Sequence, residues 1–377
     1  MFDDVLPLMV RPSTVIALIF PAYTLIYKRK TLKVDVFLIF SIIFLYSVLS
    51  IFWTPNFEEV VKFTLLVQPI NLLLLLSVII AGKYANDPLK SITKGWILFF
   101  IFSCVFGLYE IIFDQHLPTS LQQSGEFVKD GDFVLIRRFA SFTYGNYNTF
   151  VTVISMGLPM IFASSLFTKC GKTKALNFFL LPLVSYILIM NGSRGGILCF
   201  ILNLFFFLYY KKIFSIKFFI VLLILGGVIS VLLVNVNLDF LLYRIASGQI
   251  FQGSTRVEII SVCVEVIKDY YFLGTGFGSM NYILKQYMAP IPAAHNMIFE
   301  FVLEYGLLTF IIIITHFSLK ISNIKTTCKF SRYVLSITLL TFPVYTVINS
   351  VYLVYSFVWV WLGTAIVLFN VKKENYE

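Results

Sequence analysis

The chain has little charge for its length. Charged residues make up 13% of its 377 residues and hydrophobic residues 59%, whereas a soluble domain is typically about half apolar and about a quarter charged. This composition argues against the soluble protein of about two or three domains that the length alone would suggest. The chain begins Met-Phe-Asp-Asp, without a basic segment or a small-residue cleavage site, so we expect no cleaved signal peptide.

Cysteine pairs and nucleotide-binding motifs are also lacking. The five cysteines are scattered and none forms a C-x-x-C pair, so we expect neither a disulfide framework nor a zinc site. They are Cys104, Cys170, Cys199, Cys263 and Cys328. Gly171-Lys172-Thr173 has Leu166 where a phosphate-binding loop needs glycine. Gly274-Thr275-Gly276-Phe277-Gly278 follows no expected strand, so we interpret it as a flexible turn.

Little in the sequence points to a metal ion. Asp130-Gly131-Asp132 has the D-x-D spacing of metal-binding glycosyltransferases. However, Asp-Gly is an ordinary turn in a polar loop, so we expect no metal site there.

Long apolar runs take the place of charge, and the mean hydropathy is +0.89. Many runs are long enough to cross about 30 Å of hydrocarbon. We therefore expect an all-α integral membrane protein, a single polytopic domain over residues 1–377 with about 11 transmembrane helices. The expected spans are Ser13–Tyr27, Val34–Trp53, Phe63–Ala81, Gly95–Phe113, Thr149–Phe167, Leu176–Met190, Ile197–Tyr210, Phe214–Val234, His295–Thr315, Tyr333–Ile348 and Val351–Asn370. The last two would form a tight helical hairpin that turns near Asn349-Ser350.

Lysine marks one side of the membrane. Alternate loops are rich in lysine and nearly free of acid, and the positive-inside rule makes them cytoplasmic. Their lysines include Lys28, Lys30, Lys33, Lys83, Lys90, Lys94, Lys169, Lys172, Lys174, Lys211, Lys212, Lys217, Lys320, Lys325, Lys329, Lys372 and Lys373. The N-terminus is then outside and the C-terminus inside. This distribution attributes the net charge of +10 to loops that face anionic lipid, and we expect no nucleic-acid partner.

Arginine gathers on the opposite, outer side. Two long outer loops are expected, at residues 114–148 and 235–294, and most acidic residues and arginines lie on this side. The outer arginines are Arg11, Arg137, Arg138, Arg194, Arg244 and Arg256. A planar guanidinium binds phosphate or carboxylate in a way that lysine does not, so this choice indicates an anionic ligand. Within the second loop, Thr255–Tyr271 is expected to form an amphipathic helix at the outer interface. Its apolar face would be Ile260, Val264, Ile267 and Tyr271.

Three segments on the outer side could carry chemistry. Asn191-Gly192-Ser193-Arg194-Gly195-Gly196 joins two short spans, and its glycines, amides and arginine could bind an anion. Arg137 to Asn148 combines arginines with aromatic rings that suit a diphosphate and sugars. His295-Asn296 opens a span, and the imidazole could take a proton from a sugar hydroxyl. The alternatives are a plain turn with an interfacial arginine, an aromatic belt and an interfacial histidine.

At these three places the sequence resembles the O-antigen ligase/polymerase superfamily of bacterial membrane glycosyltransferases. That family has an arginine-bearing segment ending in Gly-x-x-Asn, a Ser-Arg-Gly-Gly-like turn, and a His-Asn pair after a large outer loop. The corresponding residues are Arg138 to Asn148, Ser193-Arg194-Gly195-Gly196, and His295-Asn296 with Glu300, Glu304 and Gly306 downstream. The resemblance covers about residues 137–306. Eleven spans are one fewer than the twelve expected of a full member.

The resemblance implies an oligosaccharide donor on undecaprenyl diphosphate at the outer leaflet, and neither a cofactor nor a metal ion. It implies a membrane glycosyltransferase bundle whose cavity is roofed by the large outer loop. In the resulting hypothesis His295 deprotonates or orients the acceptor hydroxyl, and Glu300 or Glu304 orients His295. Arginines stabilise the diphosphate that leaves. They are Arg194, Arg138 and Arg256, and the further substrate-binding candidates are Arg137, Arg244, Asn148, Ser193 and Asn296.

Three activities are consistent with this interpretation. A polymerase of O-antigen or capsule repeat units joins the chain to another lipid-linked unit, and an O-antigen ligase joins it to lipid A–core or to a protein. We favour the polymerase because such proteins are often short and divergent. A flippase is disfavoured because few ionisable residues lie at mid-membrane. The expected partners are the lipid-linked oligosaccharide, an acceptor glycan or glycolipid, membrane lipid and other polysaccharide-assembly proteins. The expected location is the bacterial inner membrane, with the site facing the periplasm or cell exterior.

Overall fold

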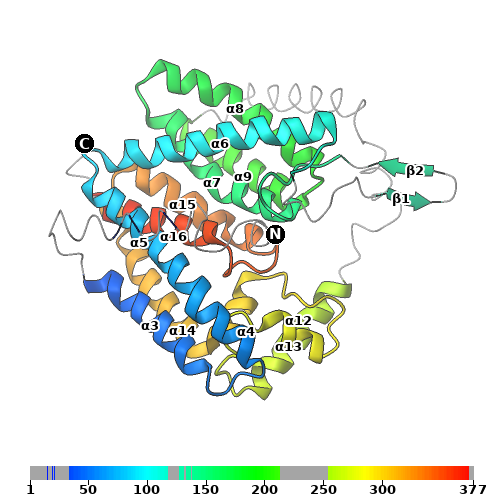
Figure 1. The fold of residues 1–377 in the computed structure, drawn as a ribbon. Coiled ribbons are helices and arrows are strands. Elements are labelled where there is room, and N and C mark those ends of the chain that lie inside the picture. Colours follow the sequence, from blue (N-terminus) through cyan, green and yellow to red (C-terminus); the bar gives the residue numbers. More distant parts are fainter. Residues whose placement is uncertain are drawn as a thin grey trace. The chain divides into compact units, whose positions relative to one another are not determined.

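The computed structural model describes residues 34–117, 127–130, 133–136, 138–212 and 254–372, together with Val15, Ile19 and Pro21. This part of the chain is mostly helical (Figure 1). The α-helices are α3 (Val34–Ser50), α4 (Phe57–Lys62), α5 (Gln68–Tyr84), α6 (Pro88–Phe113), α7 (Tyr147–Phe167), α8 (Gly171–Met190), α9 (Arg194–Tyr210), α12 (Ser254–Asp269), α13 (Met280–Gln286), α14 (Met297–Ser322), α15 (Lys329–Tyr345) and α16 (Ser356–Asn370). A π-helix, η2 (Phe63–Val67), joins α4 to α5, and a 3₁₀ turn, η3 (Ile324–Thr326), follows α14.

A short hairpin interrupts the helical pattern. Strands β1 (Phe127–Asp130) and β2 (Phe133–Ile136) pair antiparallel, with Phe127 opposite Ile136 and Asp130 opposite Phe133. The expectation of an all-α chain is therefore correct for the helices but missed this hairpin. It lies within the first expected outer loop, residues 114–148.

Five helical runs in the described residues are long and apolar enough to cross a membrane. They are Phe57–Tyr84, α6, α7, α8 and α14. The first four contain an expected span, and α14 overlaps His295–Thr315 from Met297 onward. Four helices of 15–17 residues, α3, α9, α15 and α16, overlap four more expected spans. The expected span Phe214–Val234 lies outside the described residues, as does nearly all of Ser13–Tyr27. Helical character is thus confirmed where it can be compared, whereas the count of 11 spans stays a prediction.

The expected tight hairpin near Asn349-Ser350 is wrong. Helix α15 ends at Tyr345 and α16 begins at Ser356, so an irregular segment separates them. The backbone N–H groups of Tyr352 and Leu353 in this segment donate to the carboxylate of Glu300, at 2.9 and 2.7 Å. An apolar run favours a helix, but here a buried carboxylate satisfies the backbone instead and the helix starts later.

The chain divides into two compact units, which are described one at a time. Unit 1 contains residues 93–253 and 336–348, together with the first two residues, and unit 2 contains residues 3–92, 254–335 and 349–377. In unit 1, helix α7 is buried over almost its whole length. A Cβ atom on its Gly157 would lie 2.6 Å from the ring of Trp96 in α6, so the absence of a side chain allows these helices to pack closely.

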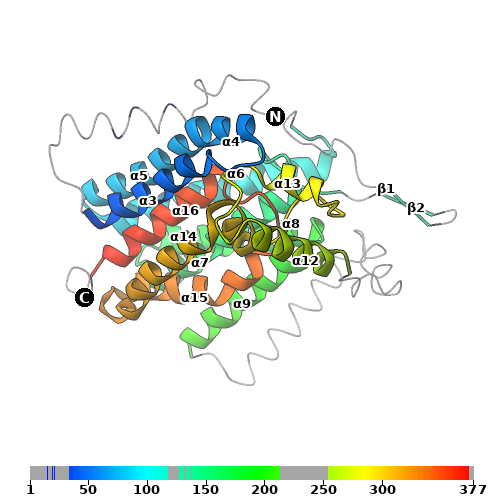
Figure 2. The ribbon, with the colours of Figure 1, turned by 90° about the horizontal axis from the view of Figure 1, so that it is seen from below.

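In unit 2, α5 and α16 pack side by side, as Figures 1 and 2 both show. Small residues make the contact close. A Cβ atom on Gly82 of α5 would lie 2.6 Å from Val367, and one on Gly363 of α16 would lie 3.0 Å from the carbonyl oxygen of Leu75. Close backbone approach at small residues is typical of helix packing within membranes.

Helix α12 covers most of the segment Thr255–Tyr271 that was expected to be an amphipathic helix, but its buried face agrees with the expected one only in part. Ile267 is buried as expected, together with Ile259, Cys263 and Val266, whereas Tyr271 is 83% exposed. Cys263 had been left out of the pattern, yet a free cysteine behaves as a small hydrophobic residue. Including it rotates the apolar face by about one residue. The helix therefore packs on protein along this face.

Helix α14 is broken at Gly306, where φ is 75° and ψ is 163°. The segment Phe272–Gly278 fills the break. Its Thr275 N–H donates to the Leu303 carbonyl at 2.7 Å, and its Gly276 N–H donates to the Glu304 carbonyl at 3.1 Å. In the other direction, the Leu307 N–H of α14 donates to the Phe272 carbonyl. The expectation of a flexible turn at Gly274–Gly278 is therefore wrong, because this backbone is buried and hydrogen-bonded to the broken helix.

Substitution of Gly306 tests this break. A Cβ atom there would lie 2.6 Å from the carbonyl oxygen of Leu273, and the positive φ disfavours any side chain. Gly306→Ala should therefore cost about 2–4 kcal/mol of stability. The apparent melting temperature of the detergent-solubilised protein measures this loss.

Gly95→Ala is the matched control. Nothing lies within 4 Å of a Cβ atom at Gly95 in α6, so this change should stabilise the helix by up to about 1 kcal/mol. An equal fall in the apparent melting temperature of both variants would contradict the contact described at Gly306.

Candidate functional site

The turn between α8 and α9 carries Arg194. Ser193 caps α9, since its Oγ accepts a hydrogen bond from the Gly196 N–H at 3.4 Å. Arg194 is the first residue of α9, and its side chain is exposed. It therefore stands at a helix N-terminus, where the helix dipole and unbonded N–H groups favour an anion.

The glycines of this turn serve packing. A Cβ atom on Gly195 would lie 2.6 Å from Cγ1 of Ile348, and one on Gly196 would collide with Val151 of α7. Sequence alone had suggested that these glycines let a ligand approach the backbone. In the structure they let neighbouring side chains approach the first turn of α9, which fixes the position of Arg194.

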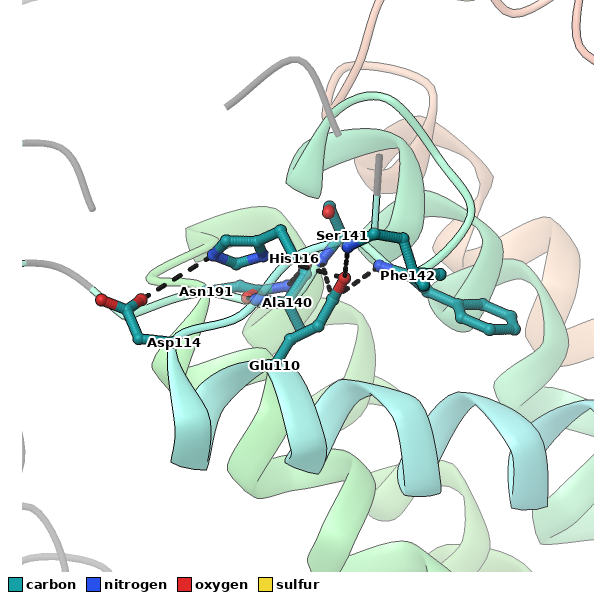
Figure 3. A network of polar contacts seen from close by, with 8 residues as sticks. Glu110, Asp114, His116, Ala140, Ser141, Phe142 and Asn191 are labelled. Carbon is teal, nitrogen blue, oxygen red and sulfur yellow. Dashed lines mark hydrogen bonds and ion pairs between the residues drawn. The ribbon is translucent and has the colours of Figure 1, made fainter. Parts of the chain in front are cut away.

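The segment Arg138–Phe142 is held by a carboxylate from α6. Glu110 is buried, with 1% of its surface exposed, and one of its oxygens accepts the N–H groups of Ser141 and Phe142, each at 2.7 Å (Figure 3). Bonds from backbone N–H to a carboxylate are stronger than those between neutral groups. Glu110 thus fixes an irregular segment that has no helix or sheet of its own.

Asn191 holds the same segment from the other side. Its side-chain oxygen accepts the Ala140 N–H at 2.6 Å, and its amide nitrogen donates to the Ala140 carbonyl at 2.9 Å (Figure 3). Asn191 lies directly before the Gly192-Ser193-Arg194 turn. Two of the three predicted segments, Arg138–Asn148 and Asn191–Gly196, are therefore brought together by direct bonds within unit 1.

Arg138 lies at the beginning of this segment and is exposed. Its Nη1 donates to the carbonyl of Ile112, at 3.2 Å, in the last turn of α6. An arginine at a helix C-terminus satisfies a carbonyl that the helix leaves unbonded. The contact uses one of the five N–H donors of the guanidinium.

Aromatic rings surround the rest of the segment. Phe142 stacks on Phe106 of α6, with centroids 5.1 Å apart, and Tyr144 stacks on Phe150 of α7 at 6.1 Å. Loss of water around Tyr144 raises the pKa of its hydroxyl, which therefore stays a neutral donor and acceptor. Asn146 caps α7 by accepting the N–H of Asn148, so Asn148 lies in the first turn of that helix.

The third predicted segment lies in unit 2. His295 has a left-handed backbone, with φ of 48°, and is half-buried. Asn296 caps α14 by accepting the N–H groups of Ile298 and Phe299, at 2.8 and 3.3 Å. A non-glycine residue with positive φ directly before a capped helix fixes the direction in which the chain enters α14.

Glu300 and Glu304 are both buried in α14, at 1% and 2% exposure. Glu300 holds the backbone of Tyr352 and Leu353, whereas Glu304 accepts the Gly278 N–H at 3.0 Å. These bonds belong to the two irregular segments that pack on α14. The orientation of His295 by either glutamate stays a prediction.

The remaining candidates lie partly outside the described residues. Arg137 and Arg244 are outside them, and Arg256 belongs to the first turn of α12. Within the described part of the chain, no group of three or more His, Cys, Asp or Glu side chains is placed to hold a metal ion.

Sequence reasoning missed the role of two residues. Glu110 was not among the candidate residues, and Asn191 was considered only as part of a turn. A single carboxylate in the apolar run Gly95–Phe113 needs hydrogen-bond donors, which was a usable signal. The identity of those donors was not readable, because they lie about 30 residues further along the chain.

Comparison with known proteins supports the resemblance. Residues 178–314 match the family described as O-antigen ligase. A segment of 163 residues, 43% of the chain, is 23% identical to the teichuronic acid biosynthesis protein TuaE of Bacillus subtilis (strain 168). The match spans 32% of that relative's length. The resemblance to the O-antigen ligase/polymerase superfamily is thus confirmed, and with the apolar helices it indicates a multi-pass membrane protein.

The cap at Asn296 can be separated from a role in substrate binding. Asn296→Asp keeps an oxygen that accepts the N–H groups of α14, so it should melt like the unchanged protein. Asn296→Ala should lose about 1 kcal/mol. Melting temperatures of the purified variants test this, and equal melting of both would contradict the cap. A loss of activity in Asn296→Asp at full stability would then assign the amide to substrate.

Proposed function

We propose that this protein transfers an oligosaccharide from undecaprenyl diphosphate to an acceptor glycan on the outer face of the bacterial cytoplasmic membrane. The reaction forms a glycosidic bond between the anomeric carbon of the donor and an acceptor hydroxyl, and releases undecaprenyl diphosphate. We propose that it polymerises repeat units of a surface polysaccharide. The proposal needs neither a metal ion nor a cofactor.

The single observation that carries the proposal is the bonded pair of arginine segments in unit 1. Arg194 starts a helix, and Asn191, three residues before it, binds the backbone of the Arg138 segment. Two guanidinium groups and a helix N-terminus suit a diphosphate, whose charge grows as it leaves. Because packing fixes Arg194 and hydrogen bonds fix the Arg138 segment, little reorganisation is needed when that charge develops.

His295 is the proposed base for the acceptor hydroxyl. Its imidazole can accept the hydroxyl proton as the new bond forms and later release it to water. Glu300 and Glu304 support it through α14, which they connect to the neighbouring segments. The further substrate-binding roles of Arg137, Arg244 and Arg256 belong to the same proposal.

The comparisons support polysaccharide assembly as the setting. The matched region, residues 178–314, includes both Ser193–Gly196 and His295–Gly306. The relative is named for teichuronic acid biosynthesis. A similar role for this chain fits a donor that carries its activation in a lipid diphosphate.

The ligase is the second candidate, because the matching family is described as O-antigen ligase. Polymerase and ligase use one donor chemistry and differ in the acceptor. The glycan pattern of a cell that lacks this protein separates them. In a cell that makes lipopolysaccharide, single repeat units on lipid A–core indicate a polymerase, and bare core with long chains on undecaprenol indicates a ligase. Repeat units trapped on the inner leaflet would indicate a flippase and overturn both.

Arg194→Ala tests the diphosphate role. Loss of a fixed cation at the leaving group should lower the rate of polymer formation by about 100-fold or more, because one such contact typically contributes that much. Arg194→Lys should retain part of the rate, because lysine keeps the positive charge but lacks the planar, bidentate donors of the guanidinium. Polymer length in complemented cells, with membrane insertion checked by immunoblot, measures the effect. Lys172→Ala, which removes an exposed cation in the first turn of α8, is the control.

His295→Gln tests the base. The side chain keeps hydrogen-bonding groups but cannot take the proton, so turnover should fall by about 100-fold or more while the donor KM changes little. Initial rates with purified protein and lipid-linked donor separate the two parameters. Turnover equal to that of the unchanged protein would exclude His295 as the base.

A further inference from the structure

The segment Tyr271–Leu273, which follows α12 in unit 2, exposes three apolar side chains in succession. Tyr271 is 83% exposed, Phe272 is 48% exposed and Leu273 is 47% exposed. Single apolar residues are normal on a protein surface, whereas a contiguous apolar patch marks a contact with a partner or with a membrane. None of the three residues belongs to the candidate site.

The backbone of this patch has a conformation that bulky side chains disfavour. The φ angle is 51° at Tyr271 and 62° at Phe272, in the left-handed region. A left-handed residue after a helix is usually glycine, and the next left-handed positions of this chain, Gly274 and Gly276, follow that rule. An aromatic residue at such a position is a conformational outlier, and a retained outlier indicates that its side chain has a task.

Helix α3 shows where lipid lies in unit 2. Leu45 and Leu49 of α3 and Phe52 directly after it follow one another at helical spacing, and they are 59%, 51% and 84% exposed. On the opposite side of the helix, Ile43 and Ser47 are buried. Because α3 overlaps an expected span, a helix face that is both apolar and exposed borders the acyl chains.

Two hydrogen bonds join the patch to the end of α3. The Tyr46 hydroxyl donates to the Leu273 carbonyl at 2.7 Å, and the Trp53 indole N–H donates to the Gly274 carbonyl at 2.8 Å. The two donor rings meet edge to face, with centroids 6.0 Å apart. Tyrosine and tryptophan gather at the boundary between membrane and water, because each has an apolar ring and a polar group. The patch is therefore bonded to α3 at the level where its lipid-facing side ends.

We propose that Tyr271–Leu273 is a membrane anchor whose side chains enter the boundary between headgroups and acyl chains at the C-terminal end of α3. In the expected topology this boundary belongs to the outer leaflet. Lipid is the occupant because the patch continues the lipid-facing side of α3 and carries the aromatic residues typical of that boundary. The contact is independent of the reaction that the protein catalyses.

The anchor replaces the interfacial contact expected of α12. The apolar face of that helix was expected to lie on the membrane, but Ile259, Cys263 and Val266 are buried in one cluster with residues of α13 and α14. The residues after the helix take over the contact with lipid. Lys268, exposed in the last turn of α12, lies on the same side of this junction and can extend to a lipid phosphate.

The anchor is also connected to the break in α14. The Phe272 carbonyl accepts the N–H of Leu307, the residue directly after Gly306. A membrane contact at Phe272 therefore fixes the level at which the broken helix meets the membrane surface. The strained backbone at Phe272 serves both contacts, since its carbonyl faces α14 while its side chain is half exposed.

Quenching of a fluorescent label tests the anchor in lipid nanodiscs. Of the five cysteines, Cys170 is exposed and the other four are buried, so Cys170→Ser provides the background for labelling one new cysteine. Phospholipids brominated on the acyl chains quench a label in lipid, and iodide quenches a label in water. A label at Tyr271→Cys should lose as much emission to bromolipid as one at Leu49→Cys on the lipid-facing side of α3. Gln286→Cys, at an exposed polar position of α13, should be quenched by iodide instead.

Two results would overturn the anchor. Iodide quenching at Tyr271→Cys equal to that at Gln286→Cys would show that the patch lies in water. Protection from both quenchers would show that protein covers the patch, either another part of this chain or a second copy.

Tyr271→Asn separates the anchor from the fold. Asparagine tolerates a left-handed backbone, so this variant should melt no lower than the unchanged protein. A label at Phe272→Cys should nevertheless lose bromolipid quenching and gain iodide quenching when Tyr271→Asn is added. Tyr271→Trp keeps an interfacial ring and should leave both values as they are with tyrosine. Equal bromolipid quenching with asparagine and with tyrosine at this position would contradict the proposal, because the ring would then contribute nothing to the membrane contact.

Discussion

Backbone amides that leave a helix among apolar side chains need an acceptor, and in this protein buried glutamates supply it. Glu110 serves Ser141 and Phe142, Glu300 serves Tyr352 and Leu353, and Glu304 serves Gly278. Asn191 does the same for Ala140 with an amide. Each of these bonds fixes an irregular segment on a helix. Where lipid surrounds the helices, no water can take over this role, and irregular backbone survives only where protein groups satisfy it.

This constraint explains how the candidate site can be rigid although much of it is loop. Arg138 lies on a segment without regular structure, yet the next residues are bonded on one side to α6 and on the other to the turn before α9. Arg194 is fixed by the packing of Gly195 and Gly196. Preorganised cations do not have to be moved into place when a leaving group develops charge, which is a main source of rate enhancement in enzymes.

Most of the helices could be predicted from the sequence, because an apolar run of sufficient length specifies a membrane helix without knowledge of its neighbours. Segments Tyr147–Phe167 and Gly171–Met190 are examples, and the expected bounds differ from the observed ones by a few residues. The irregular segments were less predictable. The late start of α16 at Ser356 depends on Glu300, which is far away in the sequence, and no local pattern reveals such a partner.

The candidate site was predictable in part for the same reason. The motif residues Arg194, Arg138 and His295 could be named from their types and order, but their supports could not. Glu110 and Asn191 connect segments that are separated by about 30 and about 50 residues, and only the fold brings them together. The buried face of α12 was predicted only in part for a different reason, since Cys263 was not counted as apolar although it lies in the core beside the expected Ile267.

The break in α14 limits which residues can stand at two of its positions. A Cβ atom on Gly274 would lie 2.5 Å from the backbone nitrogen of Gly306, and one on Gly306 would lie 2.6 Å from the carbonyl oxygen of Leu273. Neither site can accept a larger residue, because the atoms that a side chain would strike are backbone atoms, which a substitution at the other site does not remove. In related chains with this broken helix, both positions should therefore be glycine, and this pair would mark the crossing even where the surrounding sequence has diverged.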